Sequence, residues 1–86
     1  MYKRGDMLVQ VKYECIEESP FVIITRPLNN YSLCHVHLYT HQERSSSIGS
    51  FRPLIGKDMF HKDYENFLIM HNKFLKGYYI YEMYNM

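Results

Sequence analysis

Hydrophobic and polar residues alternate along the first part of the chain, and this alternation predicts β-strands. Residues 7–16, MLVQVKYECI, are apolar at every second position, which is typical of a strand with one buried face. The apolar positions of this segment are Met7, Val9, Val11, Tyr13 and Cys15. The next run, Phe21 to Thr25, is β-branched and apolar on both faces, which predicts a central strand.

Residues 31–41, YSLCHVHLYTH, alternate again and contain three histidines. The even-numbered side chains are small or apolar, so we expect them to face the core: Ser32, Cys34, Val36, Leu38 and Thr40. The odd-numbered side chains then form a row on the outer face, with neighbours about 6.5–7 Å apart along the strand. The members of this row are Tyr31, Leu33, His35, His37, Tyr39 and His41.

The second half of the chain holds one long irregular segment, one helix and one further strand. Residues 42–57 show no periodicity and exceed the usual length of a connection, which predicts a functional loop or an unseen short element. Residues 58–77 have helical periodicity, with Asp58 as the predicted N-cap and Gly77 as the C-terminal stop. Ile69 is expected on the face opposite to the apolar stripe. This stripe comprises Phe60, Tyr64, Phe67, Leu68, His71, Phe74 and Leu75. Residues 78–84, YYIYEMY, predict the last strand.

The predicted element order is therefore β-β-β-α-β, within a single small α+β domain that covers residues 1–86. A small twisted, mostly antiparallel sheet with one helix packed on one face satisfies this order. The alternative is a small five-stranded barrel with a helix, which applies if residues 42–57 contain a strand.

Composition and charge narrow the function classes. The formal charge of +1 does not indicate a strong nucleic-acid binder, whose domain is usually much more basic. We find no apolar run long enough to span a bilayer and no signal peptide, so we expect no membrane association and a cytoplasmic, reduced protein. Cys15 and Cys34 are expected to be buried free thiols. Tyr, Ile, Lys and Asn are common and Ala is absent, which is typical of AT-rich genomes such as those of bacteriophages. For a phage protein the expected location is the host cytoplasm.

The stretch HVHLYTH is the strongest candidate for chemistry. His35 and His37 share a face and could chelate a metal ion, but His41 lies too far along the strand to complete the site. We therefore expect no metal and no cofactor. The stretch resembles the His-x-His-x-His motif of the histidine-triad nucleotide hydrolases at two positions and has Tyr39 at the third, so no family is assigned. No catalytic residue is predicted, and a small His-dependent or metal-assisted nuclease is the second alternative function.

We expect a small non-enzymatic binding protein, of the kind that a phage uses to modulate or inhibit a host protein. Tyrosine and histidine side chains on an open sheet face would supply a rigid contact surface for a protein partner. The same face and the basic 42–57 segment could instead bind RNA or single-stranded DNA. Homodimerisation through an edge strand at residues 78–84 is a further alternative. The predicted partner-binding residues are Tyr31, His35, His37, Tyr39, His41, Arg44, Arg52 and Lys57.

Overall fold

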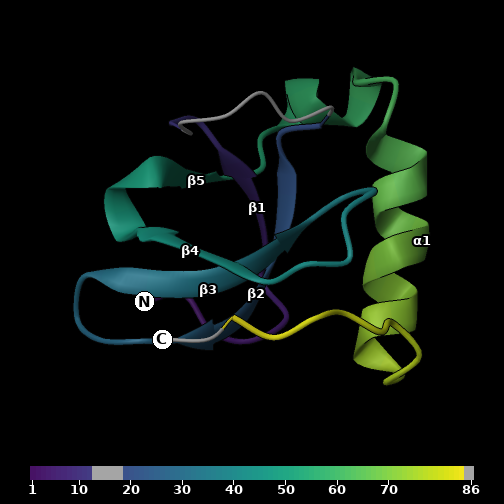
Figure 1. Ribbon diagram of the computed structural model, residues 1–86. Helices are drawn as coiled ribbons and strands as arrows, with labels where there is room; N and C mark the ends of the chain where they lie inside the picture. Colours follow the sequence, from purple (N-terminus) through teal and green to yellow (C-terminus); the bar gives the residue numbers. More distant parts are fainter. Residues whose placement is uncertain (13–18, 85–86) are drawn as a thin grey trace.

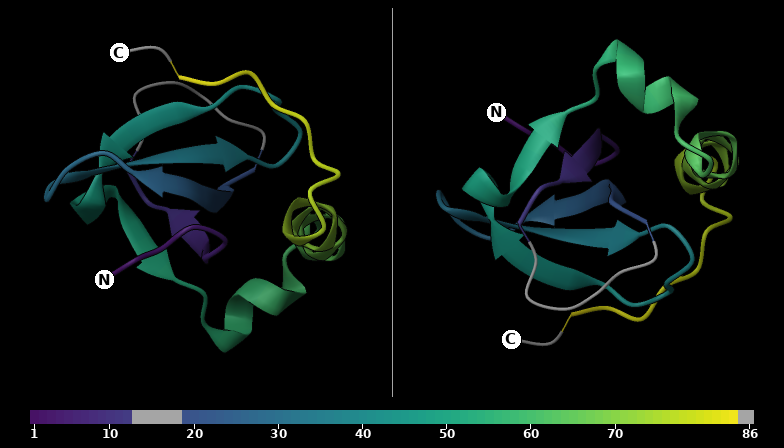
Figure 2. Two further views of the ribbon diagram at one scale, coloured as in Figure 1. Left: turned by 90° about the horizontal axis from the view of Figure 1, so that it is seen from below. Right: turned by 90° about the horizontal axis from the view of Figure 1, so that it is seen from above.

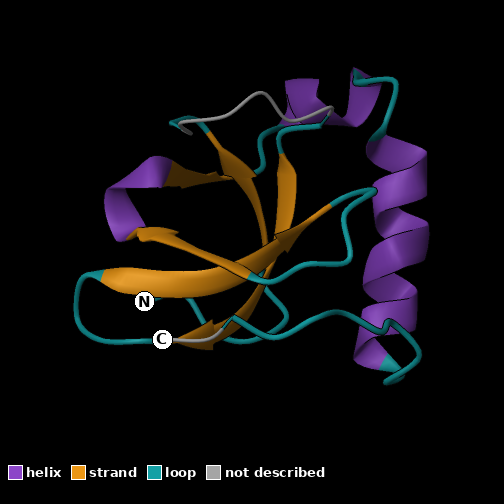
Figure 3. Ribbon diagram, viewed as in Figure 1, coloured by secondary structure: helices purple, strands orange, loops and turns teal. Residues whose placement is uncertain are grey.

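The computed structural model describes residues 1–12 and 19–84, which form a five-stranded antiparallel sheet and one α-helix (Figure 1). The strands are β1 (Met7–Gln10), β2 (Phe21–Pro27), β3 (Ser32–His37), β4 (Arg44–Ser47) and β5 (Phe51–Pro53). The 3₁₀-helix η1 (Ile48–Ser50) precedes β5. A second one, η2 (Gly56–Phe60), precedes the α-helix α1 (Tyr64–Leu75), as Figure 3 shows.

The structure confirms the predicted fold class, a small antiparallel α+β fold with one helix packed on one face of the sheet. The strand order is β4-β3-β2-β1-β5, so β4 and β5 form the two edges. The sheet is curled, and Figure 2 shows α1 nearly end-on beside it. The edges stay apart, and the sheet does not close into the alternative five-stranded barrel.

Strand β2 lies at the centre of the sheet, as its apolar sequence predicts. Val22 and Ile23 are fully buried, and Ile23 is paired with Met7 of β1 on one side and Val36 of β3 on the other. A β-bulge interrupts the pairing of β2 with β3 between Ile24 and Arg26. The bulge inserts one extra residue in β2, which re-aims the side chains that follow it.

Apolar side chains pack on both sides of the curled sheet. On the helix side, Phe67, Met70 and Phe74 of α1 pack against sheet residues that include Phe21, and the Phe21 and Phe67 rings stack with their centroids 4.8 Å apart. The cluster on the other side comprises Leu8, Val22, Ile24, Leu33 and Phe51, with Tyr2 and Ile48 packed against it. Both faces of β2 and β3 are therefore covered.

The first predicted strand is shorter than its sequence pattern suggests. β1 ends at Gln10, and Val11, which was expected on the core face, is half exposed. Tyr13 and Cys15 lie outside the described residues. Cys34 is a buried free thiol, as predicted, and burial raises its pKa.

Two segments differ from the predicted element order. Residues 42–57 contain β4, η1 and β5, so the segment without periodicity supplies two of the five strands. Residues 78–84 run beside residues 41–43 but form only an isolated parallel bridge between Gln42 and Glu82, so they are not an edge strand of the sheet. We call residues 78–84 the tail.

Helix α1 begins later than predicted. Asp58 lies in η2, and the N-cap residue of α1 is Asp63. The buried stripe consists of Phe67, Met70 and Phe74, whereas three side chains predicted in it are exposed: Phe60, Leu68 and Leu75. The predicted stop is correct, because Gly77 has a φ of +78° and the Tyr78 N–H donates to the Lys73 carbonyl at 2.8 Å, which is the Schellman arrangement.

Candidate functional site

The structure divides the predicted histidine–tyrosine row into buried and exposed members. His35 and His37 are only 1% and 2% exposed, so the prediction that they lie on the outer, solvent-exposed face of the sheet is wrong. The expectation fails because the curled sheet covers the face that a flat sheet would leave open. Tyr31, Tyr39 and His41 are exposed, but Tyr31 lies in the β2–β3 turn, at the opposite end of β3 from the other two.

The two buried histidines lie beside Phe51, on the side of the sheet away from α1. Their ring centroids are 4.9 Å apart, and the His35 ring also meets the Phe51 ring edge-on at 5.1 Å. His37 Nε2 donates to Gln10 Oε1 at 2.6 Å, and Gln10 Nε2 donates to Ser46 Oγ at 3.0 Å. Both ring nitrogens of His35 are buried, and neither makes a hydrogen bond of normal geometry with the described residues. Burial lowers the pKa of His35 to about 4, so this imidazole is neutral near pH 7.

No cluster of metal ligands accompanies the histidine pair. Within residues 1–12 and 19–84, no three side chains of His, Cys, Asp or Glu converge as metal ligands do. His71 is on α1, and its Nε2 donates to the Gly5 carbonyl at 2.8 Å. The described geometry therefore does not bring a third ligand to His35 and His37.

The three predicted cations of the 42–57 segment lie on three different elements. Arg44 is on β4 and Arg52 is on β5, at opposite edges of the strand order, while Lys57 is exposed in η2. Both Arg52 Nη atoms donate to the Asp58 carboxylate at 2.9 Å. This guanidinium lowers the pKa of Asp58 to about 2. Arg52 therefore has a structural partner.

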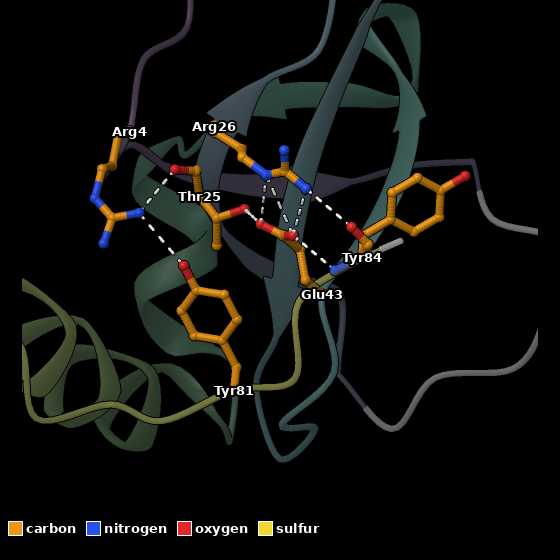
Figure 4. A network of polar contacts seen from close by, with 6 residues as sticks. All are labelled: Arg4, Thr25, Arg26, Glu43, Tyr81 and Tyr84. Atoms are coloured by element: carbon orange, nitrogen blue, oxygen red, sulfur yellow. Dashed lines mark hydrogen bonds and ion pairs between the residues drawn. The ribbon is translucent and has the colours of Figure 1, made fainter. Parts of the chain in front are cut away.

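A buried carboxylate that sequence reasoning missed lies at the start of β4. Glu43 is 2% exposed and accepts hydrogen bonds from the Thr25 hydroxyl and from Arg26, whose Nη2 lies 3.1 Å away (Figure 4). Thr25 and Arg26 both reach it because Thr25 is the unpaired residue of the β2 bulge, which lets two consecutive side chains point to the same side. Burial alone would raise the pKa of Glu43, but the hydrogen bonds from Arg26, Thr25 and the Tyr84 N–H hold it below its usual value. A lone acidic residue in a polar segment gave no sequence signal for this role.

Glu43 and its neighbours fasten the tail to the sheet. The Tyr84 N–H donates to Glu43 at 2.9 Å, and Arg26 Nη2 donates to the Tyr84 carbonyl at 3.0 Å. The backbone of Glu43 donates to the Glu82 carbonyl at 2.7 Å. Arg4 also donates to the Tyr81 hydroxyl at 3.4 Å (Figure 4). The same guanidinium lies over the Phe74 ring of α1.

The fastened tail forms one wall of an open groove of about 470 Å³. A second wall comes from the connection between β3 and β4, and the floor comes from α1. The lining residues are Leu38, Tyr39 and His41 of the connection, Asn66, Ile69, Met70 and Lys73 of α1, and Tyr78, Tyr79 and Ile80 of the tail. The groove thus combines two predicted contact residues, Tyr39 and His41, with the tail and with Ile69.

Tyr39 is held at the groove by an unusual backbone conformation. Its φ of +72° lies in the left-handed region, which is rare for a bulky side chain. Its hydroxyl donates to Asp63 Oδ1 at 3.1 Å and accepts from Asn66 Nδ2 at 2.9 Å. These two bonds to α1 fix the ring at the rim. His41 is fixed as well, because its Nδ1 donates to the Ile80 carbonyl at 3.2 Å and its ring stacks on that of Tyr79.

Large apolar side chains remain exposed around this groove. Ile80 is 83% exposed, Tyr78 is 75% exposed and Ile69 is 51% exposed. Single exposed apolar residues are ordinary, but several that share one concave surface are typical of a contact site. Ile69, which the sequence placed on the outer face of the helix, belongs to this surface.

Comparison of the chain with protein-family models, with curated proteins and with solved structures finds no match. None of the helices in the described part of the chain is long and apolar enough to cross a membrane.

Proposed function

We propose that the protein is a small non-enzymatic binding protein that docks a protein partner in the groove between the β3–β4 connection, α1 and the tail. The composition is typical of AT-rich phage genomes, and we propose a phage accessory protein whose partner is a host protein that it modulates or inhibits.

The observation that carries this proposal is an open apolar groove with exposed rims. Three separate chain segments converge to build it, and side chains such as Ile80 and Tyr78 are left in water around it. An enclosed pocket would favour a small molecule, because such ligands bury most of their surface. An open groove with protruding apolar side chains instead favours a side chain or short segment of another protein.

Charge favours a protein over a nucleic acid as the partner. Among the groove residues only Lys73 carries a permanent positive charge, and Arg52 is already bound to Asp58. A strand of nucleic acid is held mainly by several cations along its phosphates, which makes its binding strongly dependent on salt. We therefore expect partner binding that changes little when the salt concentration is raised.

The test is a pull-down from a bacterial lysate with the tagged full-length protein, with and without nuclease, followed by mass spectrometry. The wild type is compared with Ile69→Ser/Ile80→Ser, which alters the groove, and with Tyr31→Ser, which alters the other end of β3. We expect a stoichiometric protein that survives nuclease, is lost with the groove variant and is kept with Tyr31→Ser. Loss with Tyr31→Ser alone would move the contact to the β2–β3 turn. Recovery of nucleic acid, or of a protein released by nuclease, would contradict the proposal.

A further inference from the structure

The walls of the groove leave few hydrogen-bonding groups for a ligand. The Tyr39 hydroxyl is already used twice, by Asp63 and by Asn66, and His41 uses one ring nitrogen on the tail. Met70, Ile69 and Leu38 contribute only apolar surface. An occupant with an apolar body therefore suits these walls, because a buried polar group without a partner is costly.

Lys73 is the one permanently charged side chain among the residues that line the groove. Lys73 lines the groove, and its ammonium group makes no ion pair or hydrogen bond within residues 1–12 and 19–84. Lys76, the C-cap residue of α1, follows three residues later but is not among the residues that line the groove. No acidic residue is among those that line the groove, and Asp63, which holds Tyr39, is itself buried. The rim is thus suited to an anionic group.

One exposed apolar segment of the protein itself, in η2, does not have this character. Met59 and Phe60 of η2 protrude into solvent and are the most exposed apolar pair outside the groove in the described helices. They are flanked by Lys57 and Lys62, and the intervening Asp58 is bound to Arg52. A second copy that inserted Phe60 would bring lysines against Lys73. Charge therefore disfavours a second copy that docks through η2 and favours a segment of a different chain.

We infer that the groove receives an acidic peptide segment of the partner, with an apolar side chain between the walls and a carboxylate on Lys73. This inference rests on the proposed function and adds the chemistry of the partner. Charge complementarity of this kind selects among partners and speeds their association more than it tightens the complex.

The probe is a library of short random peptides, displayed and selected on the tagged full-length protein. Selected peptides are synthesised, and their Kd values are measured by fluorescence anisotropy against the wild type, Ile80→Ser, Lys73→Glu and the matched control Lys57→Glu. Circular dichroism checks that each variant is folded, and all three positions are exposed or partly exposed. The control makes the same change in net charge outside the groove.

We expect acidic peptides with at least one large apolar residue. Lys73→Glu should weaken their binding by about fivefold, because it replaces an exposed attraction with a repulsion, whereas Lys57→Glu should have no effect. A peptide in which the acidic residue is changed to lysine should regain affinity for Lys73→Glu. That reciprocal rescue would identify the pair of charges.

Four results would overturn the inference, and they differ in what else they affect. Neutral or basic peptides that need Ile80 but not Lys73 would refute the acidic partner and leave the groove as the docking site. A uridine oligonucleotide that displaces the peptides would move the site to nucleic acid. Peptides that bind Ile80→Ser as well as the wild type, or a dimer in sedimentation that Ile80→Ser abolishes, would refute the proposed function too.

Discussion

The carboxylate of Glu43 lies 3.1 Å from the guanidinium of Arg26 and is completely shielded from solvent. The arginine reaches water with about a third of its side chain, whereas the glutamate depends entirely on its protein partners. Because the same two side chains bind the backbone of Tyr84, this ion pair also fastens the tail that forms one wall of the groove. A substitution that breaks this ion pair should therefore lower the stability of the protein and also release the tail from the groove.

Arg26→Met should destabilise the protein by about 3 kcal/mol, because it leaves a buried carboxylate without its counter-charge. Urea unfolding measures this cost, and amide hydrogen exchange at Tyr84 reports release of the tail. The double variant Arg26→Met/Glu43→Gln should recover part of the loss. The control Lys3→Met breaks an exposed ion pair with Asp6 and should cost less than about 1 kcal/mol. Equal costs for Arg26→Met and Lys3→Met would show that the buried pair has no special role.

Burial of His35 should make stability fall in acid. The pKa of His35 is about 4 in the folded protein and about 6.5 in the unfolded chain, so the unfolded chain binds the proton first as the pH falls. The free energy of unfolding should therefore decrease between pH 6.5 and pH 4, by about 3 kcal/mol in total. Urea unfolding at a series of pH values measures this slope. His35→Phe should remove the His35 part of it, and His41→Phe, which removes an exposed imidazole, should keep it.

Gly77 should be required at the end of α1. Its φ of +78° is strained for any residue with a Cβ, so Gly77→Ala should cost about 1 kcal/mol. Gly49→Ala is the matched control, since its φ lies outside the left-handed region and an added Cβ would meet nothing within 4 Å. That control should be neutral or slightly stabilising. Thermal unfolding compares the two, and an equal effect at both positions would contradict the argument.

The Tyr39 hydroxyl should stabilise the groove. Tyr39→Phe keeps the ring but leaves the buried Asp63 without one of its hydrogen bonds, at an expected cost of about 1–2 kcal/mol. Tyr31→Phe makes the same chemical change at a position that is 79% exposed and should be neutral. Binding of a selected peptide should weaken only for Tyr39→Phe. If the two variants unfold at the same urea concentration, the hydroxyl contributes nothing.

The buried histidines show what a period-two pattern can and cannot predict. Alternation correctly separates His35 and His37 from Val36 and Leu38, because side chains in a strand alternate between faces. It does not say whether the second face is covered. That depends on the curl of the sheet, which brings Phe51 of β5 and Ser46 of β4 over the same face from opposite edges. Neither strand is visible in the sequence, since RSSS and FRP are short and lack a run of β-branched or aromatic residues.

For the tail, the sequence pattern predicts a strand that the sheet does not contain. Alternating tyrosines from Tyr78 to Tyr84 look like a strand, and the segment is indeed laid along residues 41–43. Its partners, however, are side chains as much as backbone: Arg26, Glu43 and Arg4 hold it at separate points. Contacts between residues so far apart in the chain are fixed by tertiary packing, and no local pattern encodes them. The groove, which requires the tail, could not have been predicted for the same reason.

The strand order also bears on aggregation. Phe21 to Thr25 is an uncharged, β-branched run of the kind that pairs readily with copies of itself once exposed. The order β4-β3-β2-β1-β5 places this run at the centre, where strands on both sides occupy its backbone groups. The edges that remain are a short serine-rich strand and a strand of three residues that contains an arginine and ends in Pro53, and both are poor templates for a further strand. This aggregation-prone run is therefore inaccessible to other copies of the chain for as long as the sheet is intact.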